Sequence, residues 1–279
     1  MILLHRVSAV SFQALIIDKN SINWQFENTG FHSGVFNMEY DEALAHELVD
    51  GKNCSTIRVY GWRPFAISLG WNQSMDEIDL NKTSTACIDI VRRPTGGRAI
   101  LHANELTYSV VMKVQDKNVG TVYEDISRAL VAGLQELGAP VVIEKSQPHF
   151  PSLYRTASAM ACFSSTGRYE IKCDGKKLVG SAQRRYAAAN GEEVVLQHGS
   201  ILLGSEHKQI VEFLSFPSEG QRVALQQELD EKTTELSTVL NRIVKFDEAA
   251  DAILKGFCNA WSVSPKVVNI IDEEKKVII

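Results

Sequence analysis

Apolar residues recur at helical spacing in several segments of the chain. In residues 37–49, "NMEYDEALAHELV", an apolar face runs through Tyr40, Leu44 and Leu48, and Asn37 is a plausible N-cap. This pattern predicts a helix that begins at Asn37. A second helix is predicted over 121–138, from a Thr121–Glu124 capping box to a stop at Gly138.

Strand patterns fill most of the chain between the helical segments. They cover 56–62, 65–70, 85–91, 106–114 and 194–203. A hairpin is predicted where Asp174-Gly175 separates two apolar runs. Helical patterns then dominate over 206–214, about 222–243 and 246–262. This order predicts an α+β fold, with a mixed, mostly antiparallel sheet wrapped by helices and a helical C-terminal end.

The domain organisation follows from the absence of a linker rich in proline and glycine. We expect one catalytic domain over residues 22–262, an N-terminal extension of unknown role over 1–21, and a C-terminal tail or strand over 263–279. The N-terminal segment is apolar but interrupted by polar residues, and it lacks a basic start and a cleavage site. We therefore expect neither a targeting signal nor a membrane span. The segment is interpreted as a peripheral strand or as the product of a misassigned translation start.

Composition narrows the function only slightly. The chain has 279 residues, of which 44% are hydrophobic and 23% charged, and a net charge of −5 argues against a general nucleic-acid binder. Eight cations fall in two short segments: Arg92, Arg93, Arg98, Lys172, Lys176, Lys177, Arg184 and Arg185. If the fold brings these segments together, they form a positive patch for an anionic ligand or an acidic protein. Dispersed, solvated charge is the alternative.

The five cysteines are scattered and include no CxxC pair, so neither a disulfide framework nor a zinc site is predicted. The seven histidines are equally dispersed. We expect a protein of the reducing cytoplasm with no bound metal and no membrane partner.

The stretch "VRRPTGGRAILH", residues 91–102, combines a glycine pair with three arginines. A nucleotide loop would open directly into a helix, because the helix N-terminus supplies the amides that bind phosphate. Here a strand pattern follows, and neither GxxxxGK[ST] nor GxGxxG spacing is present. The glycines are therefore interpreted as a close-approach loop for a ligand chain, with a structural bulge as the alternative.

Several segments, taken together, are similar to the biotin/lipoate protein ligase superfamily. They are "FNMEYDEAL" (36–44), "ISLGWNQ" (67–73), "RRPTGGRAILH" (92–102), "ACF" (161–163) and "KLVGSAQRR…LQHGSILL" (177–203). Within that superfamily the chain most resembles the LipM-type octanoyltransferases, over roughly residues 24–260. The resemblance implies the catalytic-domain fold of that superfamily.

The resemblance also implies roles for individual residues. Cys162 matches the position that carries the acyl thioester in this octanoyltransferase type, and Lys177 matches a lysine placed at the acyl carbonyl. An ammonium beside a thiol favours the nucleophilic thiolate. The remaining predicted site residues bind substrate: Arg93, Thr95, Gly96, Gly97, Arg98, His102, Gly180, Ser181, Ala182, Gln183, His198 and Gly199. We expect His102 and His198 to shape the pocket rather than to act as acid or base.

Two departures from the superfamily favour this subclass. Lipoate ligases typically carry a third glycine where this chain has Arg98, and they lack a cysteine at the position of Cys162. LipB-type octanoyltransferases carry their cysteine after the HGS-like motif, where this chain has only Cys258.

The expected reaction takes octanoyl from the pantetheine arm of acyl-carrier protein and delivers it to a lysine of a lipoyl domain. That domain is a glycine-cleavage H protein or a dehydrogenase E2 subunit, and no ATP is required. Three alternatives stay open: an ATP-dependent lipoate or biotin ligase, an octanoyl amidotransferase between lipoyl domains, and a catalytically silent ligand-binding relative.

Overall fold

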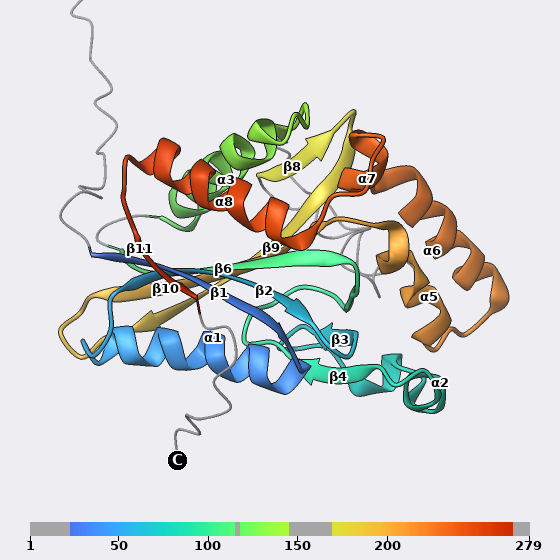
Figure 1. Cartoon of the computed structure of the whole chain (residues 1–279). Helices are drawn as coiled ribbons and strands as arrows, with labels where there is room; N and C mark the ends of the chain where they lie inside the picture. The colour runs from blue at the N-terminus through green and yellow to red at the C-terminus, as the bar shows by residue number, and fades with distance from the viewer. Residues whose placement is uncertain (1–22, 115–117, 145–168, 270–279) are drawn as a thin grey trace, which may run out of the picture.

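The computed structural model of the chain describes residues 23–114, 118–144 and 169–269. Its main feature is an eight-stranded sheet with the order β11-β1-β2-β6-β10-β9-β8-β7 (Figure 1). The strands are β1 (Trp24–His32), β2 (Ser55–Trp62), β6 (Glu105–Val114), β7 (Val142–Glu144), β8 (Glu170–Cys173), β9 (Lys176–Ala187), β10 (Glu193–Leu202) and β11 (Lys266–Asn269). Pairing is antiparallel from β2 through to β7, and parallel only where β1 meets β2 and β11. The predicted mixed, mostly antiparallel sheet is confirmed.

A small second sheet lies on one side of the large one. It has the order β4-β3-β5 and consists of β3 (Ala66–Leu69), β4 (Asp89–Arg92) and β5 (Ile100–His102). The chain between β4 and β5 carries the Gly-Gly motif. A strand therefore follows the motif, as predicted, and no helix opens from it.

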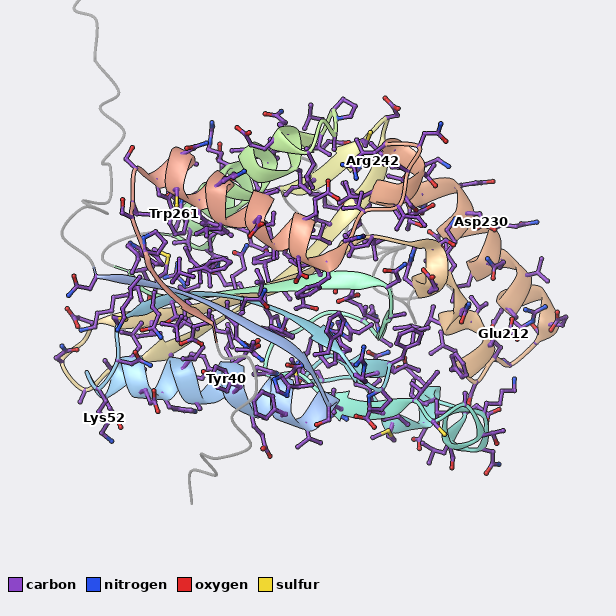
Figure 2. All side chains as sticks on the ribbon, viewed as in Figure 1. Tyr40, Lys52, Glu212, Asp230, Arg242 and Trp261 are labelled. Atoms are coloured by element: carbon purple, nitrogen blue, oxygen red, sulfur yellow. The ribbon has the colours of Figure 1, made fainter. Side chains whose placement is uncertain are left out.

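Helices cover both faces of the large sheet. On one face lie α3 (Val119–Glu136) and α8 (Phe246–Trp261), and on the other lies α1 (Gly34–Val49), beside the small sheet (Figure 1). The layer beneath α3 and α8 is filled with side chains, and Trp261 packs there against Trp24 and Phe257 (Figure 2). No helix in the described ranges is both long enough and apolar enough to cross a membrane.

Four helices follow β10 and precede α8, so the predicted helical end is confirmed in outline. They are the 3-10 helix η4 (Ser205–Gln209), α5 (Ile210–Phe213), α6 (Glu219–Lys232) and α7 (Leu236–Val239). In the sequence, the 3-10 helix η2 (Met75–Glu77) and α2 (Leu80–Thr85) come between β3 and β4. The apolar segment at the chain's end lies outside the described residues.

Three local predictions were wrong at helix starts and strand bounds. Helix α1 begins after Ser33, whose hydroxyl accepts from the Phe36 amide, because the side chain of Asn37 is buried and bonded to other elements. Helix α3 is capped by Asn118 instead of Thr121.

The predicted strand 85–91 is real only from Asp89 onward, because α2 runs through Thr85 and Cys87 turns the chain with a φ of 54°. The predicted hairpin is confirmed, with positive φ at both Asp174 and Gly175.

Candidate functional site

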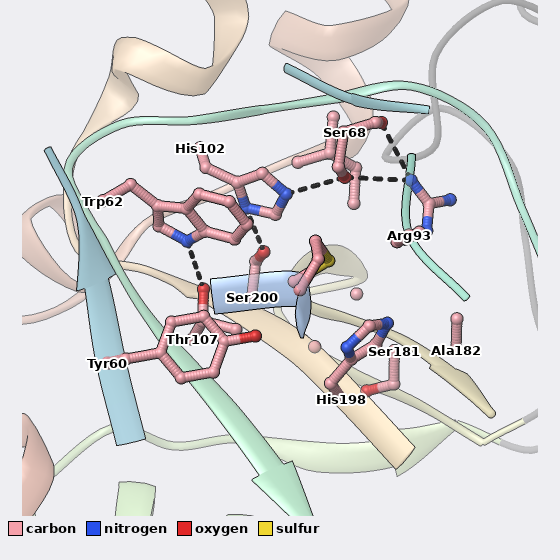
Figure 3. A pocket seen from close by; sticks show the side chains of 14 residues that line it. Tyr60, Trp62, Ser68, Arg93, His102, Thr107, Ser181, Ala182, His198 and Ser200 are labelled. Carbon is pink, nitrogen blue, oxygen red and sulfur yellow. Dashed lines mark hydrogen bonds between the residues drawn. The ribbon is translucent and has the colours of Figure 1, made fainter. Parts of the chain in front are cut away.

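A small cavity lies between the two sheets, on the side that carries α1 (Figure 3). Its walls are Met38, Tyr60, Trp62, Ser68, Arg93, Ile100, His102, Thr107, Gly180, Ser181, Ala182, His198, Gly199 and Ser200. It extends across β2, β6, β10 and β9, which are consecutive in the sheet and therefore span about 14 Å.

Seven of the predicted substrate-binding residues line this cavity: Arg93, His102, Gly180, Ser181, Ala182, His198 and Gly199. The others lie behind or beside it. Thr95 hydrogen-bonds to His198, and Gln183 donates to Gln197. Gly96, Gly97 and Arg98 are in the β4–β5 loop, outside the cavity wall.

Of the two predicted catalytic residues, the structure describes Lys177 alone. Cys162 lies outside the described residues. Lys177 is buried at the start of β9, with its Nζ 2.9 Å from Glu170 Oε1. Lys172 lies 3.8 Å from the same carboxylate and 2.9 Å from Glu144, so these cations and carboxylates form one paired cluster.

His198 is held between two side chains. Its Nδ1 lies 3.1 Å from Asp41 Oδ2, and its Nε2 lies 2.7 Å from Thr95 Oγ1. Because a carboxylate only accepts, Nδ1 carries a proton and donates it to Asp41. Asp41 also accepts from Tyr60 and forms a buried ion pair with Arg58 at 2.8 Å.

His102 forms a second arrangement of the same kind on the opposite wall. Its Nδ1 donates to Glu105 Oε1 at 2.8 Å, and its Nε2 lies 2.8 Å from Ser68 Oγ. The ring also stacks on Trp62, with centroids 3.9 Å apart and planes 12° apart. In each histidine, the carboxylate at Nδ1 and the hydroxyl at Nε2 fix the position of the ring in the cavity wall.

The Gly-Gly loop is folded around Arg93. The Arg93 guanidinium donates to the carbonyl oxygens of Ser68, Gly96 and Arg98, so this buried arginine stabilises the conformation of the loop. Gly97 has a φ of +99°, and a Cβ on Gly70 would lie 2.0 Å from the Gly97 oxygen. The second glycine thus serves the turn itself. A Cβ on Gly96 would meet open space.

Three of the four cysteines in the described residues are poor candidates for a nucleophile. Burial raises the pKa of the Cys54, Cys173 and Cys258 thiols, which makes each a poorer nucleophile at neutral pH. Cys87 is exposed in the turn after α2, so its predicted place in a strand was wrong.

The two cationic segments meet, but most of their charges have local partners. Arg184 donates to the Pro94 oxygen, and this bond joins the segments. Arg92 donates to three carbonyl oxygens of the loop after β3. Lys176 donates to the Asp230 oxygen, and Arg185 pairs with Glu193. The positive patch expected from the sequence therefore contains fewer available charges than the number of cations implies.

The sequence motifs did not predict half of the residues that line the cavity: Met38, Tyr60, Trp62, Ser68, Ile100, Thr107 and Ser200. Tyr60, Trp62 and Thr107 are on strands buried on both faces, where alternation gives no contrast between core and cavity. Ser68 and Ser200 lie within motifs that carried the resemblance, and their hydroxyls in apolar strands were the available signal.

Comparison with known proteins places this site in context. The chain matches the lipoyl protein ligase A/B catalytic domain over residues 33–258. Octanoyltransferase LipM of Symbiobacterium thermophilum is 37% identical over 257 residues, covering 91% of this chain and 92% of that one. Octanoyltransferase LipM of Bacillus subtilis is 33% identical over 258 residues, covering 90% and 91%.

Solved structures share the fold at lower identity. The bipartite lipoate protein ligase of Thermoplasma acidophilum superposes with a TM-score of 0.69 at 18% identity, covering 90% of this chain and 88% of that one. Lipoate-protein ligase A bound with ATP superposes with a TM-score of 0.68 at 20% identity, covering 90% and 89%. At these identities the likeness establishes the fold and no activity.

Proposed function

The chain belongs to the lipoyl protein ligase A/B catalytic-domain family, and on that premise we propose that it is a protein octanoyltransferase of lipoate biosynthesis. The donor is octanoyl-acyl-carrier protein, and the acceptor is a lysine of a lipoyl domain, in a glycine-cleavage H protein or a dehydrogenase E2 subunit. The observation that carries this proposal is the similarity to octanoyltransferases along about nine-tenths of both chains.

The cavity suits the acyl chain of such a donor. It crosses four strands, from Trp62 on β2 to Gly180 and Ala182 on β9, and the polar groups between are bonded mainly to one another. A hydrocarbon tail therefore meets ring faces, Met38 and Ile100 without leaving a buried donor or acceptor unpaired. We place the tail toward Trp62 and the carbonyl toward β9, where Lys177 is located.

The proposed chemistry proceeds in two steps. Cys162 thiolate attacks the octanoyl carbonyl carbon, a new C–S bond forms and the C–S bond to pantetheine breaks. The pantetheine thiolate leaves and takes up the proton that the Cys162 thiol had released. The neutral ε-amine of the acceptor lysine then attacks the enzyme thioester, which yields an amide, regenerates the thiolate and releases the amine proton. No ATP and no metal enter this scheme, since the thioester is already activated.

Lys177 is assigned to the thiolate and the developing oxyanion. A cation near the thiol lowers the pKa of cysteine, and a buried cation stabilises the charge that forms on the carbonyl oxygen. Glu170 Oε1, 2.9 Å from its Nζ, orients this lysine.

Intact-protein mass spectrometry tests the proposal directly. The protein is mixed with octanoyl-acyl-carrier protein without ATP, and the expected product is one octanoyl adduct that is absent from Cys162→Ala. Addition of a lipoyl domain should then move the adduct to that domain. An adduct that persists in Cys162→Ala, or activity that requires ATP and free lipoate, would overturn the mechanism.

A further inference from the structure

An indole and a guanidinium lie together at the edge of the candidate site. Trp71 is 53% exposed, and Arg184 Cζ lies 4.9 Å from the centroid of its ring. The same guanidinium carbon lies 4.9 Å from the ring of Tyr186. Two rings against a guanidinium fix its plane and leave its edges for hydrogen bonds.

Both residues are hydrogen-bonded to the chain around the Gly-Gly motif. The Trp71 amide donates to the Thr95 oxygen at 2.9 Å, and Arg184 Nη1 donates to the Pro94 oxygen at 3.2 Å. Arg92 donates to the Trp71 oxygen from below. The backbone of Trp71 is therefore fixed by hydrogen bonds, and its half-exposed indole packs against Arg184.

The strand β9 places this pair just beyond the cavity. Gly180 and Ala182 line the cavity, and Arg184 is the next residue on the same face of the strand. From Gly180 to Arg184 the strand advances about 13 Å. A ligand whose carbonyl lies at Gly180 and whose arm follows β9 would reach Arg184.

Charge at this position favours an anion. The Arg184 side chain is 34% exposed, and its nearest carboxylate, Glu42 Oε1, is at 3.8 Å and itself 39% exposed. That separation is the outer limit of an ion pair, so an incoming anion can compete for the guanidinium. The fork of an arginine matches phosphate oxygens in two parallel hydrogen bonds.

From these contacts we infer that Trp71 and Arg184 bind the phosphopantetheine arm of the acyl donor. The indole packs against the amide-containing arm, and Arg184 binds its phosphate. This inference rests on the proposed function, because it assumes a donor that carries its acyl group on such an arm. It adds the residues that distinguish a phosphorylated arm from a bare thioester.

Two small donors that differ only in the phosphate test the inference. Acyl-enzyme formation is followed by mass spectrometry with octanoyl-4′-phosphopantetheine and with octanoyl-pantetheine. In Arg184→Gln we expect kcat/KM to fall about tenfold with the phosphorylated donor and to change less than about twofold with the other. Trp71→Ala should slow both donors, since the indole contacts the shared part of the arm.

Neighbouring variants control for folding and for general charge. Arg185→Gln removes the adjacent arginine, which pairs with Glu193, and should leave the ratio between donors unchanged. Arg184→Lys keeps the charge without the fork and should give an intermediate loss. Equal losses on both donors in Arg184→Gln, or no loss on either, would overturn the inference while leaving the proposed function standing. Failure of the wild type to form an acyl-enzyme with either donor and with octanoyl-acyl-carrier protein would overturn both.

Discussion

Asp41 Oδ2 lies 3.1 Å from His198 Nδ1, although 157 positions separate the two residues in the chain. Asp41 is fully buried and also pairs with Arg58. Burial alone would raise the pKa of the Asp41 carboxyl, but Arg58 and His198 together hold it below its ordinary value. This carboxylate therefore joins α1, β2 and β10 behind the cavity.

We predict that Asp41→Asn is strongly destabilising. The substitution leaves the buried Arg58 guanidinium without its counter-charge, and breaking such a pair costs about 3–5 kcal/mol. Denaturant unfolding measures the loss. Glu39→Gln, which removes an exposed carboxylate from the same helix, should change stability by less than about 0.5 kcal/mol. Equal effects of the two substitutions would contradict this account of Asp41.

Periodicity predicted β2, β3, β6 and β10, but it missed β1 and the ends of α1. The pattern of apolar residues identified the helix because its buried face repeats every three to four residues. It could not reveal that Asn37 would donate to the Gly61 oxygen and accept from Arg58, contacts that remove it from the capping position. Ser33, four residues earlier, was then the residue whose hydroxyl met a free amide.

The sequence likewise predicted some residues of the candidate site and missed others. Motif segments supplied His102, His198 and the glycines, because their chemistry is visible in single residues. Tyr60 and Trp62 were missed, because β2 is buried on both faces and only the second sheet, formed by distant segments, determines which face borders a cavity. Packing between sheets is not encoded in local spacing.

Trp62 is predicted to limit acyl chain length. It lines the buried cavity and also an open groove on the surface, bordered by Phe31 and Phe65, so its indole separates the two. Trp62→Leu should connect them and raise the rate of acyl-enzyme formation with ten- and twelve-carbon donors relative to octanoyl. The measurement is a chain-length series by mass spectrometry.

The control for Trp62 is a lining residue changed without loss of volume. Met38→Leu should leave the chain-length preference unaltered, because its side chain keeps nearly the same size. If Trp62→Leu retains its fold by thermal melting and still rejects longer chains, Trp62 is not the limit.

Lys177 is predicted to control the reactivity of Cys162. In Lys177→Gln the pKa of that thiol should rise by about one unit or more, which lowers the thiolate fraction about tenfold at pH 7. Iodoacetamide labelling, mapped to the Cys162 peptide in a Cys87→Ser background, measures the rate. Lys176→Gln, an exposed neighbour on the same strand, should leave it unchanged. An unchanged labelling rate in Lys177→Gln would remove the lysine from the mechanism.

His207 should make the fold sensitive to mild acid. Burial lowers its pKa to about 4, from an ordinary 6.5. The folded state therefore takes up this proton at a lower pH than the unfolded state. The contribution of neutral His207 to stability is fully present above pH 6.5 and is lost as the pH falls toward 4. The loss is about 3 kcal/mol from this group. His207→Gln should flatten that part of the curve of unfolding free energy against pH, and an equally steep curve in the variant would contradict the assignment.

The two glycines of the loop between β4 and β5 should respond differently to alanine. Gly97→Ala places a side chain at a φ of +99° and should cost about 1–2 kcal/mol in thermal or denaturant unfolding. Gly96→Ala meets open space, so stability should be unchanged. If the arm of the donor passes over this loop, Gly96→Ala will nonetheless slow acyl-enzyme formation, because the added methyl group occupies the approach. A Gly96→Ala protein with normal stability and a normal acylation rate would show that the donor takes another path to the cavity.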